Sequence, residues 1–86
     1  MLATTAAGSF TATKGKHEVV AVVFRERLQQ LREKRRISRQ ILSELCGLHP
    51  DAIRRYERGE CEPNLESLIA ISDFFDVSVD YLIGRE

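Results

Sequence analysis

Basic and acidic side chains occupy different parts of this 86-residue chain, although its net charge is zero. Between Arg25 and Arg58 there are ten Lys/Arg against five Asp/Glu, whereas residues 59–86 hold one arginine and seven acids. Cations at this density attract phosphate, so the basic half indicates a surface for nucleic acid. Two ordinary solvated faces are the alternative, and charge alone favours neither interpretation.

Few residues of the sequence are of a type and spacing that would bind a metal ion or catalyse a reaction. Cys46 and His49 form a Cys-x-x-His pattern with Cys61 further along, but a structural zinc site needs four ligands. We expect no metal, with Cys46 in the core and Cys61 as an exposed free thiol. The sequence has no glycine-rich phosphate loop and no plausible nucleophile–base pair, and so small a chain is not expected to form a deep pocket. We therefore expect neither an enzyme nor a cofactor.

The segment around Gly47 predicts two short helices joined by a tight turn. Ser38 is typical of an N-cap for a helix over residues 39–46, and glycine after it can take the left-handed conformation that ends a helix. A third helix is expected to begin at Pro50 and to end at Gly59. The side chains expected to be buried are Ile41, Leu42, Leu45, Leu48, Ile53 and Tyr56. This unit, about residues 38–59, has helix-turn-helix spacing, in which the second helix lies in the DNA major groove.

The flanking segments predict three more helices in one all-α domain over residues 18–86. The first is expected to start between Glu18 and Phe24 and to end near Arg35, because apolar residues recur there at helical spacing. Asn64 and Ser78 are expected to cap a fourth helix and a last helix over residues 79–83. Side chains expected to face inward on the fourth helix are Leu65, Leu68, Ile69, Ile71 or Ser72, and Phe75. Residues 1–17 lack periodicity and are expected to form a flexible arm.

Apolar segments are short throughout the sequence. The longest run covers six residues, 19–24, which is far too few to span a bilayer. The N-terminus also lacks the charge and apolar pattern of a secretory signal. We therefore expect a soluble, cytoplasmic protein that does not contact membranes.

Several short motifs occur together, in order, between Phe24 and Gly84. They are Ile37-Ser38, Gly47-Leu48, Ile53, Tyr56-Glu57-Arg58-Gly59, Pro63 and Val77-Ser78-Val79-Asp80-Tyr81-Leu82. In this order and spacing the chain resembles the phage lambda-repressor and Cro-like helix-turn-helix family, also called XRE-type. The resemblance implies a compact five-helix DNA-binding domain.

The resemblance also implies which side chains contact DNA. The positions carried over are Arg39, Gln40, Pro50, Asp51, Arg54, Arg55 and Arg58. Arg39 stands where the family usually has a glutamine that touches phosphate, a contact that arginine makes with a full charge. Arg54 and Arg55 are expected to read guanine O6 and N7 or to clamp phosphate. Arg58 is expected to contact the DNA backbone.

Three acidic residues depart from the family pattern. Asp51 faces bases in the family arrangement, where it could accept a hydrogen bond from cytosine N4 or merely favour the positive end of the third helix. Glu60 and Glu62 lie in a loop where many relatives carry lysine or arginine. Acids close to phosphate weaken binding, unless the loop points away from DNA.

Two further sets of residues have expected roles. Arg32 and Glu57 match a pair that bridges the first and third helices in some relatives, which predicts a partly buried ion pair that orients the recognition helix. Phe74 stands where the family usually has a small residue and is expected to be exposed. Because exposed aromatic residues mark interfaces, Phe74, Tyr81 and Ile83 are a candidate homodimer surface.

The resulting functional hypothesis is a transcriptional regulator. It is a repressor that binds an inverted repeat in double-stranded DNA as a dimer, with half-sites about 34 Å apart. The alternative is an antitoxin-like or regulator-binding module that binds a protein through its acidic C-terminal half and has weak or no affinity for DNA. Asp51, Glu60 and Glu62 favour that alternative.

Overall fold

The computed structural model describes the backbone of residues 2–86 and the side chains of residues 17–86. The helices are α1 (Leu2–Lys34), α2 (Arg39–Leu45), α3 (Ala52–Arg58), α4 (Leu65–Phe75) and α5 (Val79–Leu82). No strand occurs within residues 2–86, and none of the helices there combines the length and apolar content that crossing a bilayer requires. The expected all-α fold with five helices is confirmed.

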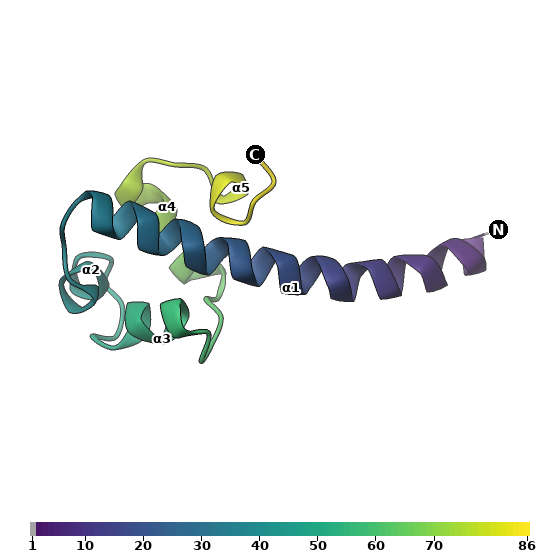
Figure 1. The fold of residues 1–86 in the computed structure, drawn as a ribbon, viewed down its shortest axis with the longest axis horizontal. Helices are drawn as coiled ribbons and strands as arrows, with labels where there is room; N and C mark the ends of the chain where they lie inside the picture. Colours follow the sequence, from purple (N-terminus) through teal and green to yellow (C-terminus); the bar gives the residue numbers. More distant parts are fainter. Residues whose placement is uncertain (1) are drawn as a thin grey trace.

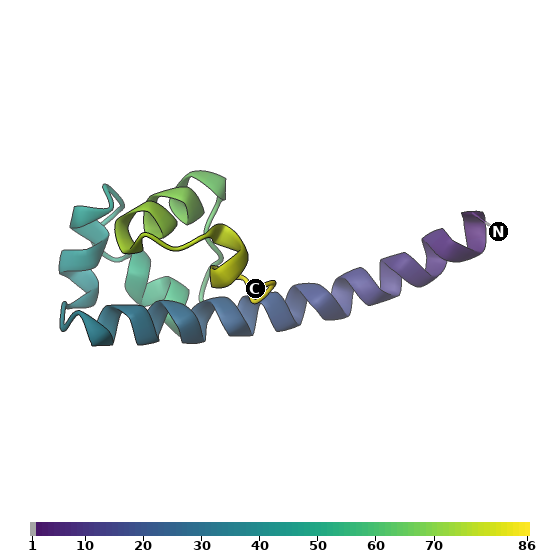
Figure 2. The same ribbon diagram turned by 90° about the horizontal axis from the view of Figure 1, so that it is seen from above.

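The first helix, α1, is 33 residues long and begins at Leu2. Figures 1 and 2 show its C-terminal half beside the four shorter helices and its N-terminal half running beyond them. The predicted start between Glu18 and Phe24 was therefore wrong. Residues 2–17 contain four alanines and no proline, so the helix can extend through them from its packed part. The mobility of residues 1–17 stays a prediction, and the side chains of residues 1–16 lie outside those described.

The core lies where all five helices meet. Each helix contributes one aliphatic side chain with no exposed surface, and these are Leu28, Leu42, Ile53, Ile71 and Leu82. Phe24, Tyr56 and Phe75 are buried with them. Removing one large apolar side chain from water contributes about 1.5–3 kcal/mol. The shared core thus stabilises helices that are too short to form alone.

Helix ends follow the predicted caps closely. The side chains of Ser38, Asn64 and Ser78 each accept a hydrogen bond from the backbone N–H three residues later, at 3.1, 2.8 and 2.9 Å. These bonds satisfy N–H groups that have no partner within the helix. Gly47 has a φ of +72°, the left-handed conformation expected after α2. The three predicted N-caps and the glycine turn are confirmed.

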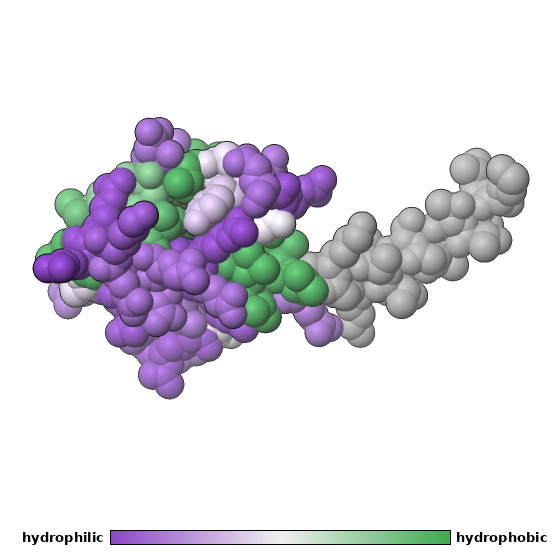
Figure 3. All heavy atoms as spheres, turned by 45° about the horizontal axis from the view of Figure 1, so that its top comes forward, coloured by the Kyte–Doolittle hydropathy of each residue, from purple (hydrophilic) through white to green (hydrophobic). Residues whose placement is uncertain are grey.

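The predicted inward face was wrong for four side chains of α2 and α4. The exposed ones are Ile41, Leu45, Leu65 and Ile69. Figure 3 shows apolar surface in the region of α4. Ser43 and Ser67 are buried instead, and Ser72 is buried together with Ile71, for which it was the expected alternative. Ser43 and Ser72 donate hydrogen bonds to backbone carbonyls of their own helices, both at 2.9 Å, so their hydroxyls tolerate burial.

Candidate nucleic-acid interface

The chain passes from α2 to α3 through a turn over residues 46–51. The Gly47 N–H donates to a carbonyl at the end of α2 at 3.0 Å, which closes that helix. The Ala52 N–H donates to the His49 carbonyl at 2.9 Å, three residues back, so Pro50 lies in the turn. The prediction that the third helix begins at Pro50 was therefore wrong by two residues.

The N-terminus of α3 is capped by a side chain of α2. The Ile53 N–H donates to the fully buried Ser43 Oγ at 3.1 Å, while Ser43 donates to the Arg39 carbonyl. Asp51 occupies the N-cap position of α3 but its side chain makes no capping bond. Ser43 thus fixes α3 against α2. Sequence reasoning missed it, although a serine four residues after Arg39, beside the buried Leu42, was the available signal.

Asp51 holds two of the arginines that were expected to contact bases. Its carboxylate accepts two hydrogen bonds from Arg54, from Nε at 2.5 Å and from Nη2 at 2.7 Å. Arg55 Nε donates to the same carboxylate at 3.2 Å. The hydrogen bonds and positive charge, above all those of Arg54, lower the pKa of Asp51 to about 2. Asp51 also raises the pKa of Arg54. Both partners are therefore charged at neutral pH.

Glu60, directly after the C-cap of α3, pairs with two arginines of that helix. Its Oε2 lies 3.3 Å from Arg54 Nη1 and 3.1 Å from Arg58 Nε. Arg54 is thereby held on two sides, by Asp51 and by Glu60. All three arginines on the outer side of α3 have a carboxylate partner within the domain.

Glu57 makes the most buried ion pair of the interface. Its side chain is 3% exposed and accepts hydrogen bonds from Arg32 Nε at 2.7 Å and from Arg32 Nη2 at 3.1 Å. Arg32 also donates to the Ile37 carbonyl at 3.0 Å. Arg39 Nε donates to Glu57 at 2.9 Å. The arginine expected to touch phosphate is thus anchored to the last turn of α3.

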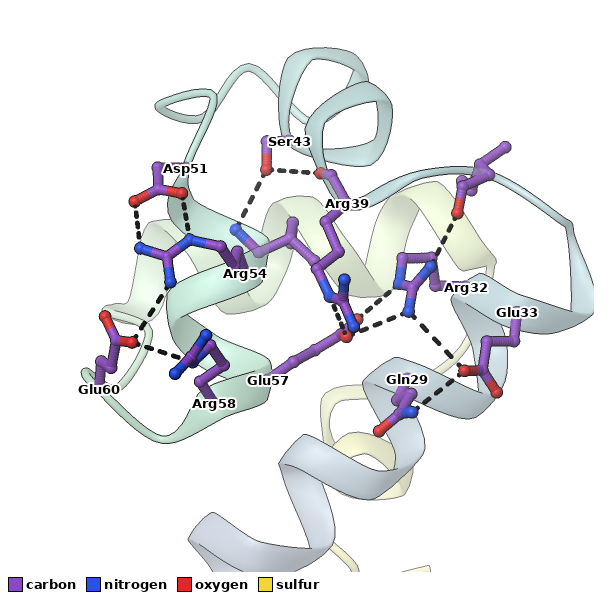
Figure 4. Close-up of polar contacts among 12 residues, drawn as sticks. Gln29, Arg32, Glu33, Arg39, Ser43, Asp51, Arg54, Glu57, Arg58 and Glu60 are labelled. Carbon is purple, nitrogen blue, oxygen red and sulfur yellow. Dashed lines mark hydrogen bonds and ion pairs between the residues drawn. The ribbon is translucent and has the colours of Figure 1, made fainter.

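Figure 4 shows a set of ion pairs in two separate groups, one centred on Glu57 and one in which Arg54 joins Asp51 to Glu60. We call it the arginine–carboxylate network. Its arginines are Arg32, Arg39, Arg54, Arg55 and Arg58, and its carboxylates are Asp51, Glu57 and Glu60. All the arginines but Arg32 reach solvent, from 37% exposed for Arg54 to 65% for Arg58. Arginines outnumber acids, so the surface stays cationic.

The remaining residues expected at the DNA surface lie on its margin. Gln40 is exposed on α2 and donates to Glu44 at 3.2 Å. Pro50 is exposed in the turn before α3. Glu62 pairs with His17 of α1 at 2.8 Å and belongs to a different contact from Glu60. The two loop acids that were grouped in the sequence therefore have separate partners.

The residues expected to form a dimer surface are less exposed than predicted. Phe74 is half-buried, because its ring packs edge-on against Phe75 with centroids 5.0 Å apart and lies under the Arg35 guanidinium. Tyr81 is half-buried beneath Arg27, whose carbon Cζ is 4.3 Å from the ring centre. Ile83 is half-buried as well. Each of the three keeps part of its surface in solvent.

A groove of about 270 Å³ lies between α1 and residues 59–63. Phe24, Tyr56 and Leu68 supply part of its apolar lining. The four exposed arginines of the network do not line it. Among the side chains of residues 17–86, no three His, Cys, Asp or Glu residues form a cluster that could hold a metal ion. Both cysteines are free thiols, and burial raises the pKa of Cys46.

Two short helices at a fixed angle, with arginines along the outer side of the second, define a helix-turn-helix protein. The sequence profile of the helix-turn-helix family matches residues 28–82, and the chain belongs to this family. The resemblance drawn from the sequence motifs is confirmed.

Similar proteins of known name are regulators of transcription. The HTH-type transcriptional activator BcrR of Enterococcus faecalis is 41% identical over 63 residues, which cover 73% of this chain and 31% of that protein. The HTH-type transcriptional regulator AnsR of Bacillus subtilis strain 168 is 39% identical over 61 residues, which cover 71% of this chain and 53% of that protein. The chain thus spans between about a third and about half of these relatives.

The crystal structure of the P22 c2 repressor protein in complex with a synthetic operator has a similar fold. It superimposes with a TM-score of 0.68 at 36% identity, covering 73% of this chain and 96% of that one. The expected lambda-repressor-like architecture is confirmed by this match.

Proposed function

We propose that this domain is a transcriptional regulator that binds double-stranded DNA sequence-specifically, with α3 in the major groove. The observation that carries the proposal is the set of exposed arginines on α2 and α3, mounted on two helices whose angle Ser43 and Glu57 fix. The likeness to a repressor solved on its operator supports it. Major-groove readout requires such donors on a rigid helix.

The roles follow from the position of each side chain. Arg54 and Arg55 read bases, Arg39 and Arg58 bind phosphate, and Gln40 and Pro50 lie beside the DNA backbone. Arg39 suits a phosphate contact, because it projects from the N-terminal end of α2 and stays anchored to Glu57. Phosphate contacts set the register and base contacts set the sequence preference.

We further propose that the regulator acts as a repressor and binds an inverted repeat as a homodimer. The dimer surface comprises Phe74, Tyr81 and Ile83, whose exposed portions lie on α4 and at α5, away from the network. Such a protein occupies promoter DNA in the cytoplasm and needs neither catalysis nor a cofactor. Analytical ultracentrifugation of Phe74→Ala tests the surface: association falls if Phe74 lies at the interface, and unchanged association excludes it.

A second candidate function is a protein-interaction module that uses the acidic C-terminal half. The observation that favours it is the internal pairing of every exposed arginine on α3. Salt-dependent binding to random duplex DNA separates the two functions. Complete absence of binding at low salt favours the protein-interaction module.

Selection of bound sequences from a random duplex pool, followed by affinity measurements, tests the DNA-binding proposal. We expect Arg54→Ala or Arg55→Ala to cost about 1–3 kcal/mol at the selected site and to relax its sequence preference. Arg39→Ala is expected to weaken binding to all duplexes alike. Equal losses for all three variants on every duplex would contradict the assigned base contacts.

A further inference from the structure

We propose that Asp51 and Glu60 are specificity-determining residues that act as internal substitutes for DNA. They occupy the arginines of α3 in the free domain and suppress binding to non-cognate duplexes. This inference rests on the proposed function, because it concerns how the same surface selects its operator. It predicts a domain with weak general DNA affinity and a high ratio of specific to non-specific binding.

The hydrogen bonds of Arg54 show how a carboxylate can take the place of DNA. An arginine reads guanine or clamps a phosphate with two parallel N–H groups. On Arg54 these are Nε and Nη2, and both donate to Asp51 at 2.5 and 2.7 Å. Nη1 on the other side lies 3.3 Å from Glu60. Arg54 therefore has to release the Asp51 carboxylate before the same two N–H groups can bind DNA.

Exposure shows which acids can be displaced. The side chains of Asp51 and Glu60 are 34% and 43% exposed, so water and phosphate can reach the carboxylates and replace their hydrogen bonds. Exposed pairs of this kind are weak. Glu57 is enclosed by Arg32 and Arg39, and separating it from them would strand a buried charge. In the network, DNA can thus displace Asp51 and Glu60 from their arginines, whereas Glu57 stays paired.

The consequence differs between cognate and non-cognate DNA. Non-cognate binding depends on phosphate contacts, and each contact by Arg54, Arg55 or Arg58 breaks an existing ion pair and leaves a carboxylate near the DNA. At an operator, base-edge hydrogen bonds compensate for the lost pair. The two acids therefore penalise non-cognate duplexes more than the operator.

Neither Asp51 nor Glu60 makes another side-chain contact within residues 17–86 that would give it a structural role. Asp51 makes no capping bond to α3, since Ser43 supplies that bond. Glu60 lies in the exposed segment after α3 and contacts only Arg54 and Arg58 among its side-chain partners in the described residues. Neutral amides at these positions keep the shape of the side chains and remove the charge.

The test measures affinity of the full chain for a random-sequence duplex and for a duplex selected by the wild type, at several salt concentrations. The variants are Asp51→Asn, Glu60→Gln and the double variant. The matched control is Glu66→Gln/Asp73→Asn, which removes two exposed charges from α4 that form no ion pair among the described side chains. Circular dichroism verifies that each variant is folded.

We expect the double variant to bind the random duplex about ten times more tightly than the wild type, with each single variant intermediate. Its affinity for the selected duplex is expected to rise less, so the specificity ratio falls. A random-duplex affinity that rises no more than in the control overturns the inference, as does an equal rise on both duplexes. Failure of the proposed function is a separate result, in which the wild type binds neither duplex at low salt.

Discussion

Glu57 and Asp51 each pair with two arginines, yet they do so in contrasting surroundings. Glu57 is 3% exposed and joins Arg32 of α1 to Arg39 of α2. Asp51 is 34% exposed and joins arginines of its own helix. Burial, rather than the number of ion pairs, therefore decides what each carboxylate does. The buried one holds α3 in place, and the exposed one can be exchanged for a ligand.

The largest expected effect on stability comes from removing the buried carboxylate. Glu57→Ala leaves the buried Arg32 guanidinium with only the exposed Glu33 carboxylate, 3.9 Å away, which is expected to cost about 3–5 kcal/mol of unfolding free energy. Chemical denaturation measures this loss. The control Asp51→Ala breaks an exposed pair and is expected to be much less destabilising than Glu57→Ala. Similar losses for both variants would remove the distinction between the two sites.

A smaller loss is expected when Ser43 is replaced by alanine. The Ile53 N–H would then be buried without an acceptor, which costs about 1–3 kcal/mol. Ser72→Ala is the matched control, because that buried hydroxyl bonds only to the Ile69 carbonyl of its own helix. Thermal unfolding of the two variants compares them. If Ser72→Ala is the more destabilising, Ser43 does not cap α3 as described.

The smallest effect on stability is expected from titrating Asp51. With a folded-state pKa of about 2 against an ordinary value near 3.9, its ion pairs contribute fully above about pH 5 and are lost as the pH falls through about 2. A carboxyl-carbon NMR titration should give a midpoint near 2. In Arg54→Ala the midpoint is expected to rise toward the ordinary value, because Arg54 is the main cause of the shift. A wild-type midpoint near 4 would mean that the pair does not persist in solution.

Local sequence signals predicted much of the fold. The three caps and Gly47 act within a few residues, and capping depends only on local backbone geometry. The start of α1 could not be predicted, because residues 2–17 and residues 18–34 differ in helix propensity. The helix extends into residues 2–17 from the second segment, residues 18–34. The inward face of α2 was predicted only in part: Leu42 is buried as expected, but a buried serine, Ser43, takes the place of the exposed Ile41 and Leu45.

The candidate site was predictable in its residues but not in its pairings. Motif positions supplied Arg39, Arg54 and Arg55 directly. The partners of these arginines depend on rotamers and on where residues 59–63 lie, which are tertiary properties. Asp51 was weighed as a base contact or a helix-start residue. It does occupy the N-cap position of α3, and it is in addition the counter-ion of Arg54 and Arg55, a pairing that the sequence did not predict.

Chemical-shift mapping with the selected duplex shows whether α2 and α3 form the DNA-binding surface. Two-dimensional ¹H–¹⁵N spectra of the full chain are recorded with and without the duplex, together with arginine side-chain Nε signals. We expect the largest changes in α2, the turn over residues 46–51 and α3, with shifts at the Nε of Arg54 and Arg55. Changes confined to α4 and α5, or none at low salt, would contradict this expectation.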